Sequence, residues 1–331
     1  MLSKNNILRC ALAAAAAAVA LASASVCAQG EAQWPNKPVR FICPFPPGGS
    51  VDPLARLTSA RLNAALGQQF VVDNRTGGSG SIGTALGAKS APDGYTFVIV
   101  FDTHAVNPSL IPNLPYDTLK DLSNVMLVGT APMVLTTNPS KPFKGFADVV
   151  SAAKAKPAAL TFGSVGSGSL GHLAMMLVQS QAAMKMVHIP YKGGGPAITD
   201  TIGGQIDFAV TSVAVPGPHI KAGRLRAVVS TGDRRSPVVP DTPTLIESGL
   251  PGLSAHAWWG WVAPAGLSKP MLNRMHGELV KVYAQPELRK QLTEQFGMDV
   301  VASTPEAMTK FLTTEIARWG KVVKDNVIRA D

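Results

Sequence analysis

Cysteine is scarce in this 331-residue sequence, which excludes a fold stapled by several disulfides. The three cysteines are Cys10, Cys27 and Cys43, and the first two fall in an N-terminal segment that we expect to be removed. A single remaining cysteine cannot form an internal disulfide, so the hydrophobic core must hold the fold by itself. Cys43 lies in an apolar run and is predicted to be a buried, unreactive side chain.

Charged and aromatic residues are also few, at 15% and 6% of the chain. The formal net charge is +9, and the basic residues are spread over the sequence. There is no stripe of basic and aromatic residues, which argues against a nucleic-acid partner. A mildly basic surface instead favours the attraction of anionic solutes to a cleft.

Long apolar runs are confined to the N-terminus, and no later stretch is long enough to span a bilayer. Lys4 and Arg9 precede an apolar segment at 11–22, which is the pattern of a secretory signal peptide. Val26-Cys27-Ala28 fits a small-x-small cleavage site, so we expect residues 1–28 to be removed and the mature protein to be exported. Cys27 leaves a lipoprotein anchor open as an alternative.

Strand-like and helix-like segments alternate along the rest of the chain, which predicts an α/β fold with parallel sheets covered by helices. Two short apolar runs at 125–128 and 133–136 are together predicted to cross between two domains, and a tryptophan-rich run at 258–263 is predicted to cross back. The first domain would comprise 29–131 and 263–331 and the second 132–262, with a ligand cleft between them. The expected strands lie at 39–43, 70–73, 95–101, 160–163, 187–189, 208–211 and 225–231, the expected helices at 54–66, 81–89, 146–155, 170–183, 197–202, 270–283, 286–296 and 305–324, and a proline-rich loop at 107–115.

The stretch Pro44-Phe45-Pro46-Pro47-Gly48-Gly49-Ser50-Val51-Asp52 joins an expected strand to an expected helix, which is where α/β proteins place ligands. Its prolines fix the backbone, whereas Gly48 and Gly49 leave bare amides at the start of the helix, which Ser50 is expected to cap. An anion is favoured at such a helix start, so the loop is interpreted as a pocket for a small carboxylate. A rigid turn without a ligand is the alternative.

A second glycine-rich loop, Gly163-Ser164-Val165-Gly166-Ser167-Gly168-Ser169, has the same setting and precedes the helix that carries His172. Its hydroxyl groups and amides suit a carboxylate in the same way. Because the two loops belong to different domains, we expect them to face each other across the cleft, and two unrelated flexible loops are the alternative. A third polar loop at 102–107 follows a buried strand and is expected to line the same pocket.

Patterns for catalysis are weaker than these loops. The Gly-x-Ser-x-Gly elbow of α/β-hydrolases is absent around Ser164 and Ser167, and the scattered histidines lack metal-ligand spacing. Gly78-Ser79-Gly80-Ser81-Ile82-Gly83 does match the dinucleotide fingerprint, and Asp102 lies 19 residues beyond it. Residues 74–77 separate this fingerprint from its strand, where a Rossmann turn is tight. An exported nucleotide-dependent enzyme stays open as an alternative.

A set of longer motifs extends from Trp34 nearly to the end of the chain. They include Trp34-Pro35-x-Lys37-Pro38-Val39-Arg40, the proline-glycine loop at 44–52, Asp73-Asn74-Arg75, Ala91-Pro92-Asp93-Gly94-Tyr95-Thr96, Val187-His188-Ile189-Pro190-Tyr191-Lys192-Gly193 and Pro240-Asp241-x-Pro243-Thr244. In these residues the chain resembles the Bug family, the extracytoplasmic solute receptors of tripartite tricarboxylate transporters.

The resemblance implies a two-lobed periplasmic-binding-protein fold of type II, with two Rossmann-like α/β domains joined by two crossing strands. It implies a periplasmic receptor, not an enzyme, that closes on a small mono-, di- or tricarboxylate with no cofactor or metal. The implied partners are the membrane components of a tripartite tricarboxylate transporter, and the receptor itself is expected to be a monomer. A sensor that serves a membrane signalling partner through the same pocket is the alternative.

Carried over residue by residue, the resemblance implies ligand contacts from both lobes. The first-lobe contacts are Phe45, Gly48, Gly49, Ser50, Asp52, Thr103 and His104. The second-lobe contacts are Ser164, Val165, Gly166, Ser167, Gly168, Ser169 and His172, with Asp207 nearby. Relatives often carry an acidic or amide residue just after the strand that follows Asp207. Here Thr211-Ser212-Val213-Ala214 stands in its place, which favours a ligand with carboxylates and no amine.

Overall fold

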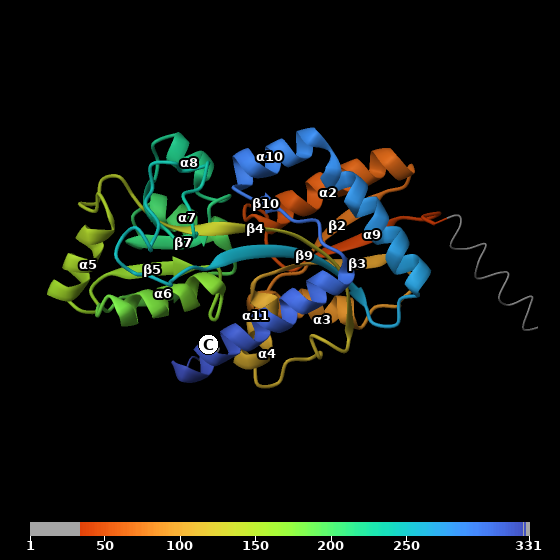
Figure 1. The fold of residues 1–331 in the computed structure, drawn as a ribbon, viewed down its shortest axis with the longest axis horizontal. Helices are drawn as coiled ribbons and strands as arrows, with labels where there is room; N and C mark the ends of the chain where they lie inside the picture. The colour runs from red at the N-terminus through yellow and green to blue at the C-terminus, as the bar shows by residue number, and fades with distance from the viewer. Residues whose placement is uncertain (1–33, 327, 329–331) are drawn as a thin grey trace, which may run out of the picture.

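Two long antiparallel strands run through the middle of the computed structural model, which describes residues 34–326 and 328 (Figure 1). These strands are β4 (Leu122–Thr137) and β9 (His256–Pro264), and they pair along the whole of β9. β4 continues beyond this pairing, and its residues Met133–Thr137 pair with strands of the second lobe. Within the described residues a ten-stranded sheet therefore passes through both lobes, as the two predicted crossings require.

The first lobe is a sheet with helices on both faces. Its strands are β1 (Val39–Cys43), β2 (Phe70–Asn74), β3 (Thr96–Phe101) and β10 (Asp299–Val300), and its helices are α2 (Val51–Leu66), η1 (Gly78–Gly80), α3 (Ser81–Ala88), α4 (Thr103–Leu110), α9 (Lys269–Ala284), α10 (Pro286–Phe296) and α11 (Pro305–Asp325). β1 is parallel to β2 and β3, and β9 is antiparallel to β3. Figure 1 shows α2, α9 and α10 on one face of this sheet and α3, α4 and α11 on the other.

The second lobe repeats this layered plan. Its strands are β5 (Thr161–Ser164), β6 (Val187–Pro190), β7 (Phe208–Ser212) and β8 (Arg226–Ser230), and its helices are α5 (Phe146–Ala155), α6 (Leu170–Gln181), α7 (Gly194–Ile202) and α8 (Gly217–Lys221). β5 is parallel to β6 and β7, whereas β7 and β8 are antiparallel to β4. The helices that follow β1, β5 and β6 therefore begin at the carboxyl ends of parallel strands, the usual edge for ligands.

The tryptophans of β9 fill the sheet at the crossing. Trp261 packs on Phe41 of β1 with ring centroids 4.4 Å apart, and Trp258 packs edge-on against Phe311 of α11 at 5.4 Å. Successive strand residues point to opposite faces, so this run supplies both layers of the core. Trp258, Trp259 and Trp261 are fully buried, so they form part of the core at the crossing.

The predicted elements agree with the observed ones to within three residues at their ends, with two exceptions. Residues 102–107 and 107–115 were expected to form two successive loops, but α4 takes in Thr103–Leu110, with Pro108 inside it. The two apolar runs expected at 125–128 and 133–136 are one strand, β4. It passes through Pro132, where its partner changes from β9 to β7, and a residue without an amide donor is tolerated at such a switch.

The two predicted domain limits agree with the observed strand pairing to different degrees. The first limit, at 131, lies beside the change of partner along β4, whereas the second, at 262, falls inside β9. In β9, residues 259–262 pair with β3 of the first lobe. The division into 29–131 with 263–331 and 132–262 thus stays a prediction, and the pairing favours a second limit nearer to His256.

Cys43 was predicted to be a buried, unreactive side chain. Cys43 is fully buried, and burial raises the pKa of its thiol to about 12, which confirms an unreactive side chain.

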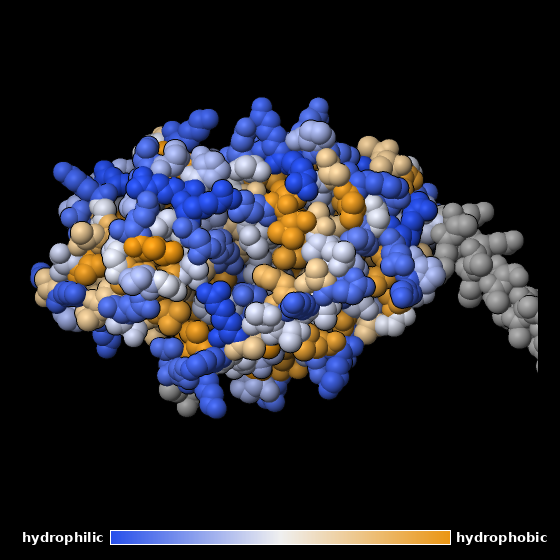
Figure 2. All heavy atoms as spheres, viewed as in Figure 1, coloured by the Kyte–Doolittle hydropathy of each residue, from blue (hydrophilic) through white to orange (hydrophobic). Residues whose placement is uncertain are grey.

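Across residues 34–326 and 328, no helix combines the length and apolar character that crossing a bilayer requires. Figure 2 shows that hydrophobic residues on this face form separate patches among polar ones. The expected signal peptide lies outside the described residues.

Candidate functional site

The first glycine loop brings bare backbone to the start of α2. β1 ends at Cys43 and α2 begins at Val51, and Gly48 between them has a φ of 87°, which favours glycine. The predicted helix cap is wrong, because Ser50 has helical backbone angles and its side chain makes no capping hydrogen bond. Since no side chain caps α2, its first amide groups are available to an external acceptor.

Polar side chains around this loop hold it in place. Asn74 Nδ2 donates to the Phe45 carbonyl at 2.9 Å and to one carboxylate oxygen of Asp52 at 2.8 Å. Arg56 Nε donates to the other Asp52 oxygen at 2.9 Å. The Phe45 ring packs edge-on against Phe101, with centroids 5.6 Å apart. Asp52 is buried and both its oxygens have partners, so it stiffens the loop.

The start of α7 lies opposite this loop, on the second lobe. A Cβ atom added to Gly195 would be 2.9 Å from the Gly48 carbonyl oxygen, and one added to Gly49 would be 3.9 Å from the Gly194 amide nitrogen. Gly193, the residue before α7, similarly faces Pro46, and no side chain caps α7. Two uncapped helix starts from different lobes therefore face each other.

The start of α7 was not among the predicted site residues. The available signal was the run Gly193-Gly194-Gly195, which follows a strand and opens a helix as the other two loops do. Glycine is needed here because the backbone of the first lobe leaves no room for a side chain at Gly195.

A hollow of about 520 Å³ opens beside these two helix starts, and it is shared between the lobes. Its lining residues are Pro47 and Gly48 from the first lobe, and Gly195, Pro196, Ile198, Thr199, Asp200, Val215 and His219 from the second. Burial, with the nearby Arg224, lowers the pKa of His219, so this ring is mainly neutral at neutral pH. The wall thus combines bare amides with a small number of polar groups, as small-ligand sites do.

The second glycine loop is organised around one hydroxyl group. Ser164 Oγ donates to the Gly166 carbonyl at 2.9 Å and accepts from Ser169 Oγ at 3.1 Å and from the Gly166 amide at 3.3 Å. It also shares a hydrogen bond of 2.7 Å with Nε2 of His188 on β6. Val165 is buried in the core. The hydroxyl groups predicted to grip a ligand are thus engaged largely with one another.

The start of α6 is capped, in contrast to those of α2 and α7. Ser169 has extended backbone angles, and its Oγ accepts a hydrogen bond from the His172 amide. Nδ1 of His172 accepts from the Gly168 amide at 3.1 Å, so this nitrogen carries no proton. The His172 ring stacks on His188 with centroids 3.8 Å apart. His172 therefore holds the loop in place through these two contacts.

Asp102 faces the same helix start from the first lobe. It is fully buried at the position before α4, and the peptide N–H groups of Leu170 and Thr103 lie near its carboxyl group without a hydrogen bond of normal geometry. Burial is the main cause that raises the pKa of Asp102 well above its usual range, and Glu315 of α11 adds to it. A carboxyl group of the protein thus already lies at the start of α6.

Thr103 and His104 begin α4 and are both buried. Neither ring nitrogen of His104 has a hydrogen-bond partner among the described residues, and burial lowers the pKa of the ring to about 3. The ring lies nearly parallel to that of Tyr116, with centroids 6.3 Å apart. His104 is therefore a neutral histidine of the first-lobe core, and its predicted ligand contact is not supported by this geometry.

The structure does not bring Asp207 to the other predicted residues. Its carboxylate accepts from Lys141 Nζ at 2.8 Å and from the amide of Thr161 at 3.0 Å. Burial opposes ionisation, but Lys141 and Thr161 outweigh it and lower the pKa of Asp207. Thr161 begins β5, whereas the glycine loop follows the end of that strand, so Asp207 lies at the opposite edge of the sheet. We therefore correct the prediction: Asp207 is a structural ion-pair partner.

The structure does not support the dinucleotide-binding interpretation, because the acidic residue that it requires is buried. A nucleotide fingerprint needs an exposed acid that can bind a ribose hydroxyl. Asp102, which has the required spacing, is fully buried between the two lobes. The segment Gly78–Gly80 forms a short 3₁₀ turn that contacts the second lobe through Ser79.

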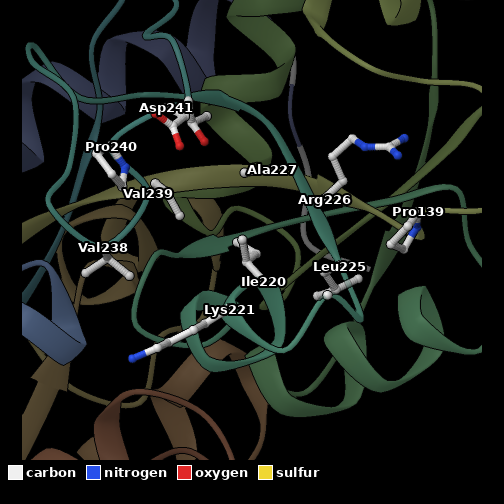
Figure 3. Close-up of a pocket in the computed structure, with 12 residues that line it drawn as sticks. Pro139, Ile220, Lys221, Leu225, Arg226, Ala227, Val238, Val239, Pro240 and Asp241 are labelled. Carbon is white, nitrogen blue, oxygen red and sulfur yellow. The ribbon is translucent and has the colours of Figure 1, made fainter.

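Another hollow, of about 550 Å³, belongs to the second lobe alone (Figure 3). Ile220 and Lys221 of α8, Arg226 of β8 and the loop around Asp241 line it. Figure 3 shows Lys221 extending away from the apolar centre of the hollow. Because one lobe supplies all of its lining, lobe closure cannot change its shape. We therefore place the candidate site between the lobes.

Comparisons with known proteins agree with this two-lobed arrangement. The family described as "Tripartite tricarboxylate transporter family receptor" matches residues 54–328. BugT of Bordetella pertussis is 37% identical over 300 residues, which cover 88% of this chain and 90% of BugT. Rpa4515 of R. palustris, solved with adipate, superposes with a TM-score of 0.86 at 31% identity, covering 90% of this chain and 100% of that one. MatC of Rhodopseudomonas palustris, solved with malate, gives 0.82 at 30% identity over 88% of this chain and 100% of that one. This chain therefore belongs to the family of tripartite tricarboxylate transporter receptors, as its motifs predicted.

Proposed function

We propose that this chain is a periplasmic receptor that captures a small carboxylate between its lobes and delivers it to the membrane components of a tripartite tricarboxylate-type transporter. The observation that carries the proposal is the pair of uncapped helix starts, α2 and α7, that face each other from different lobes. Further support comes from two relatives, at 31% and 30% identity, whose structures hold adipate and malate.

Helix starts can bind an anion without a lysine or arginine. Each start carries about half of a positive charge, and its bare amides donate to anionic oxygens. A dicarboxylate in the hollow beside Gly48 and Gly195 would satisfy amides of both lobes at once. Bending at β4 and β9 would then close the lobes over it, in the manner of other hinged binding proteins.

We further propose that the ligand carries no ammonium group. Two acidic groups at the site already have partners: Asp52, in the first turn of α2, is bound by Asn74 and Arg56, and Asp200, which lines the hollow, accepts from the Tyr191 hydroxyl at 2.7 Å. An ammonium group would need an acidic partner of its own. The site thus favours carboxylates over amino acids.

The proposal also includes cleavage of the signal peptide after Ala28 and a monomeric receptor. Mass spectrometry of protein recovered from the periplasm should give a chain that begins at Gln29 and carries no lipid. Native mass spectrometry of the same sample should give the mass of one chain. A chain that begins before Gln29, a lipid attached at the N-terminus, or a stable dimer would contradict these parts of the proposal.

Isothermal titration with adipate, L-malate and L-aspartate tests the proposed ligand class. We expect a dissociation constant of about 1 μM for at least one of the two dicarboxylates, or about −8 kcal/mol, and at least tenfold weaker binding of aspartate. Gly49→Asp should abolish binding because it adds a negative charge at the start of α2. Gly145→Asp is the matched control, since a side chain there meets open space. Undiminished affinity in Gly49→Asp, or binding of none of the three ligands by protein freed of endogenous anions, would overturn the proposal.

A further inference from the structure

The turn Gly77–Gly80 has a contact that the proposed ligand site does not use. Ser79, within the turn, has φ 51° and ψ 38°, the left-handed conformation that serine rarely adopts. Gly77, Gly78 and Gly80 around it also have positive φ values, which glycine takes without strain. A strained residue among unstrained glycines persists only where its surroundings hold it.

The surroundings that hold Ser79 come from both lobes. Its hydroxyl donates to the Ser167 carbonyl on the second lobe at 3.0 Å, and its own carbonyl accepts from Asn107 Nδ2 of α4 at 3.2 Å. Beneath the turn, the Phe45 ring lies where a side chain on Gly80 would meet it, at 3.1 Å. The turn is thus supported by the first lobe and reaches into the second.

The loop of the second lobe is shaped to receive this hydroxyl. A Cβ atom on Gly166 would lie 2.7 Å from Ser79 Oγ, so the absence of a side chain there lets the two segments approach. One step further along the chain from Ser167, a Cβ atom on Gly168 would clash with Leu110 at the end of α4. The first lobe therefore touches the second glycine loop at two neighbouring points.

We infer that Ser79 is an interlobe latch, a positioning residue that holds the loop Gly163–Ser169 in the closed arrangement. The two partners of its hydrogen bond belong to different lobes, so opening at β4 and β9 must break the bond. The inference rests on the proposed function in one respect, namely that closure serves ligand capture. The latch slows opening, and thus ligand release, without contributing to the first encounter.

A disulfide trap tests the juxtaposition without any ligand. In Ser79→Cys/Gly166→Cys the two Cβ atoms would be 3.7 Å apart, within the range that disulfides require. Cys43 is buried and does not compete in the folded protein. We expect dissolved molecular oxygen to oxidise the pair in the purified protein, the oxygen taking up the two electrons and two protons as hydrogen peroxide, with loss of both free thiols and a mass decrease of about 2 Da. The control Ser79→Cys/Gly193→Cys should stay reduced, because Gly193 faces Pro46.

Ser79→Ala tests the latch with no new side chain in the second lobe. The dissociation rate of adipate or L-malate, whichever binds, should rise about fivefold in stopped flow, the factor for one hydrogen bond of average net strength. The association rate should be unchanged. Ser79→Gly should release ligand equally fast and be slightly more stable, because glycine removes the backbone strain.

The two experiments decide between a latch and a merely structural turn. Oxidation of the Ser79/Gly166 pair together with faster release from Ser79→Ala supports the latch. A folded Ser79→Cys/Gly166→Cys protein that stays reduced, or a Ser79→Ala protein with an unchanged dissociation rate, overturns it. The disulfide result stands even if no carboxylate binds, so failure of the proposed function is read separately from failure of the latch.

Discussion

The two glycine-rich loops share one sequence pattern, but the helix after the first loop is uncapped and the helix after the second is capped. In the first loop, Ser50 adopts helical angles, with ψ −22°, and leaves α2 uncapped. In the second, Ser169 adopts extended angles, with ψ 155°, and its hydroxyl caps α6. Side-chain hydrogen bonds through Ser164 and the stacked His172 and His188 then occupy much of the second loop.

The difference shows where an anion can be received in this molecule. At α6 the protein supplies its own cap and places the Asp102 carboxyl group nearby. At α2 and at α7 no side chain occupies that position. The second lobe thus offers an open helix start at Gly194, one loop away from the position that the sequence predicted. The loop Gly163–Ser169 instead contacts the first lobe through Ser79 and Leu110.

The largest expected effect comes from blocking the open start of the second lobe. Gly195→Asp would place a Cβ atom 2.9 Å from the Gly48 carbonyl and a negative charge beside the ligand. We expect carboxylate affinity to fall at least a hundredfold, or about 2.7 kcal/mol, in calorimetry. Gly203→Asp, which puts the same charge at the other end of α7, should bind as the parent protein does. Equal affinities in the two variants would contradict a binding role for the start of α7.

Local patterns in the sequence predicted most of the fold, because strand and helix periodicity is a property of neighbouring residues. They also predicted the two crossings between the lobes. The helix α4 was missed because Pro108 was weighted as a helix breaker, although the helix tolerates it near its end.

The candidate site was predicted only in part, because its geometry depends on contacts between distant segments. The backbone angles that separate Ser50 from Ser169 are set by packing, not by residue type. The sequence likewise did not predict which loops are in contact, because Gly48 and Gly195 meet from different lobes. Asp207 was misplaced because a position next to a strand does not tell which edge of the sheet it occupies.

The carboxyl group at the capped start offers a test through pH. The pKa of Asp102 is raised in the folded protein, so the folded state keeps a proton that the unfolded chain releases. Stability from this group is complete below the unfolded pKa of about 3.9 and falls as pH rises toward the folded pKa. Asp102→Asn removes this titration.

Urea unfolding at pH 4 and pH 8 measures the effect of Asp102→Asn. The free energy of unfolding should exceed that of the parent protein at pH 8, because the neutral amide avoids the cost of ionising a buried carboxyl group. At pH 4 the two proteins should differ less. Asp207→Asn is the matched control, because the pKa of Asp207 is lowered and its contribution is lost only as the pH falls below about 3.9, so this variant should be less stable than the parent protein at both pH values. Parallel pH profiles for Asp102→Asn and the parent would contradict the buried, protonated state.

A smaller effect should follow from removal of the cap itself. Ser169→Ala deletes the hydroxyl that accepts from the His172 amide and donates to Ser164. Loss of an N-cap typically costs about 1 kcal/mol, and we expect that decrease in the free energy of unfolding from urea titration. Ser169→Asp, which can still cap, should recover most of it. A loss in Ser169→Asp equal to that in Ser169→Ala would show that capping is not what the hydroxyl provides.

The smallest change in stability should come from the equivalent serine of the first loop, and this makes it the sharpest test of the comparison. Ser50→Ala removes a hydroxyl that makes no capping hydrogen bond and introduces a residue that favours the helical angles already present. The free energy of unfolding should therefore change by less than about 0.5 kcal/mol. If the Ser50 hydroxyl contacts the carboxylate, as the family resemblance implies, affinity should fall about fivefold, the value of one hydrogen bond. Urea unfolding and calorimetry on one preparation measure both quantities. A loss of stability in Ser50→Ala as large as that in Ser169→Ala would mean that the two helix starts are equivalent after all, because both serines would then act as caps.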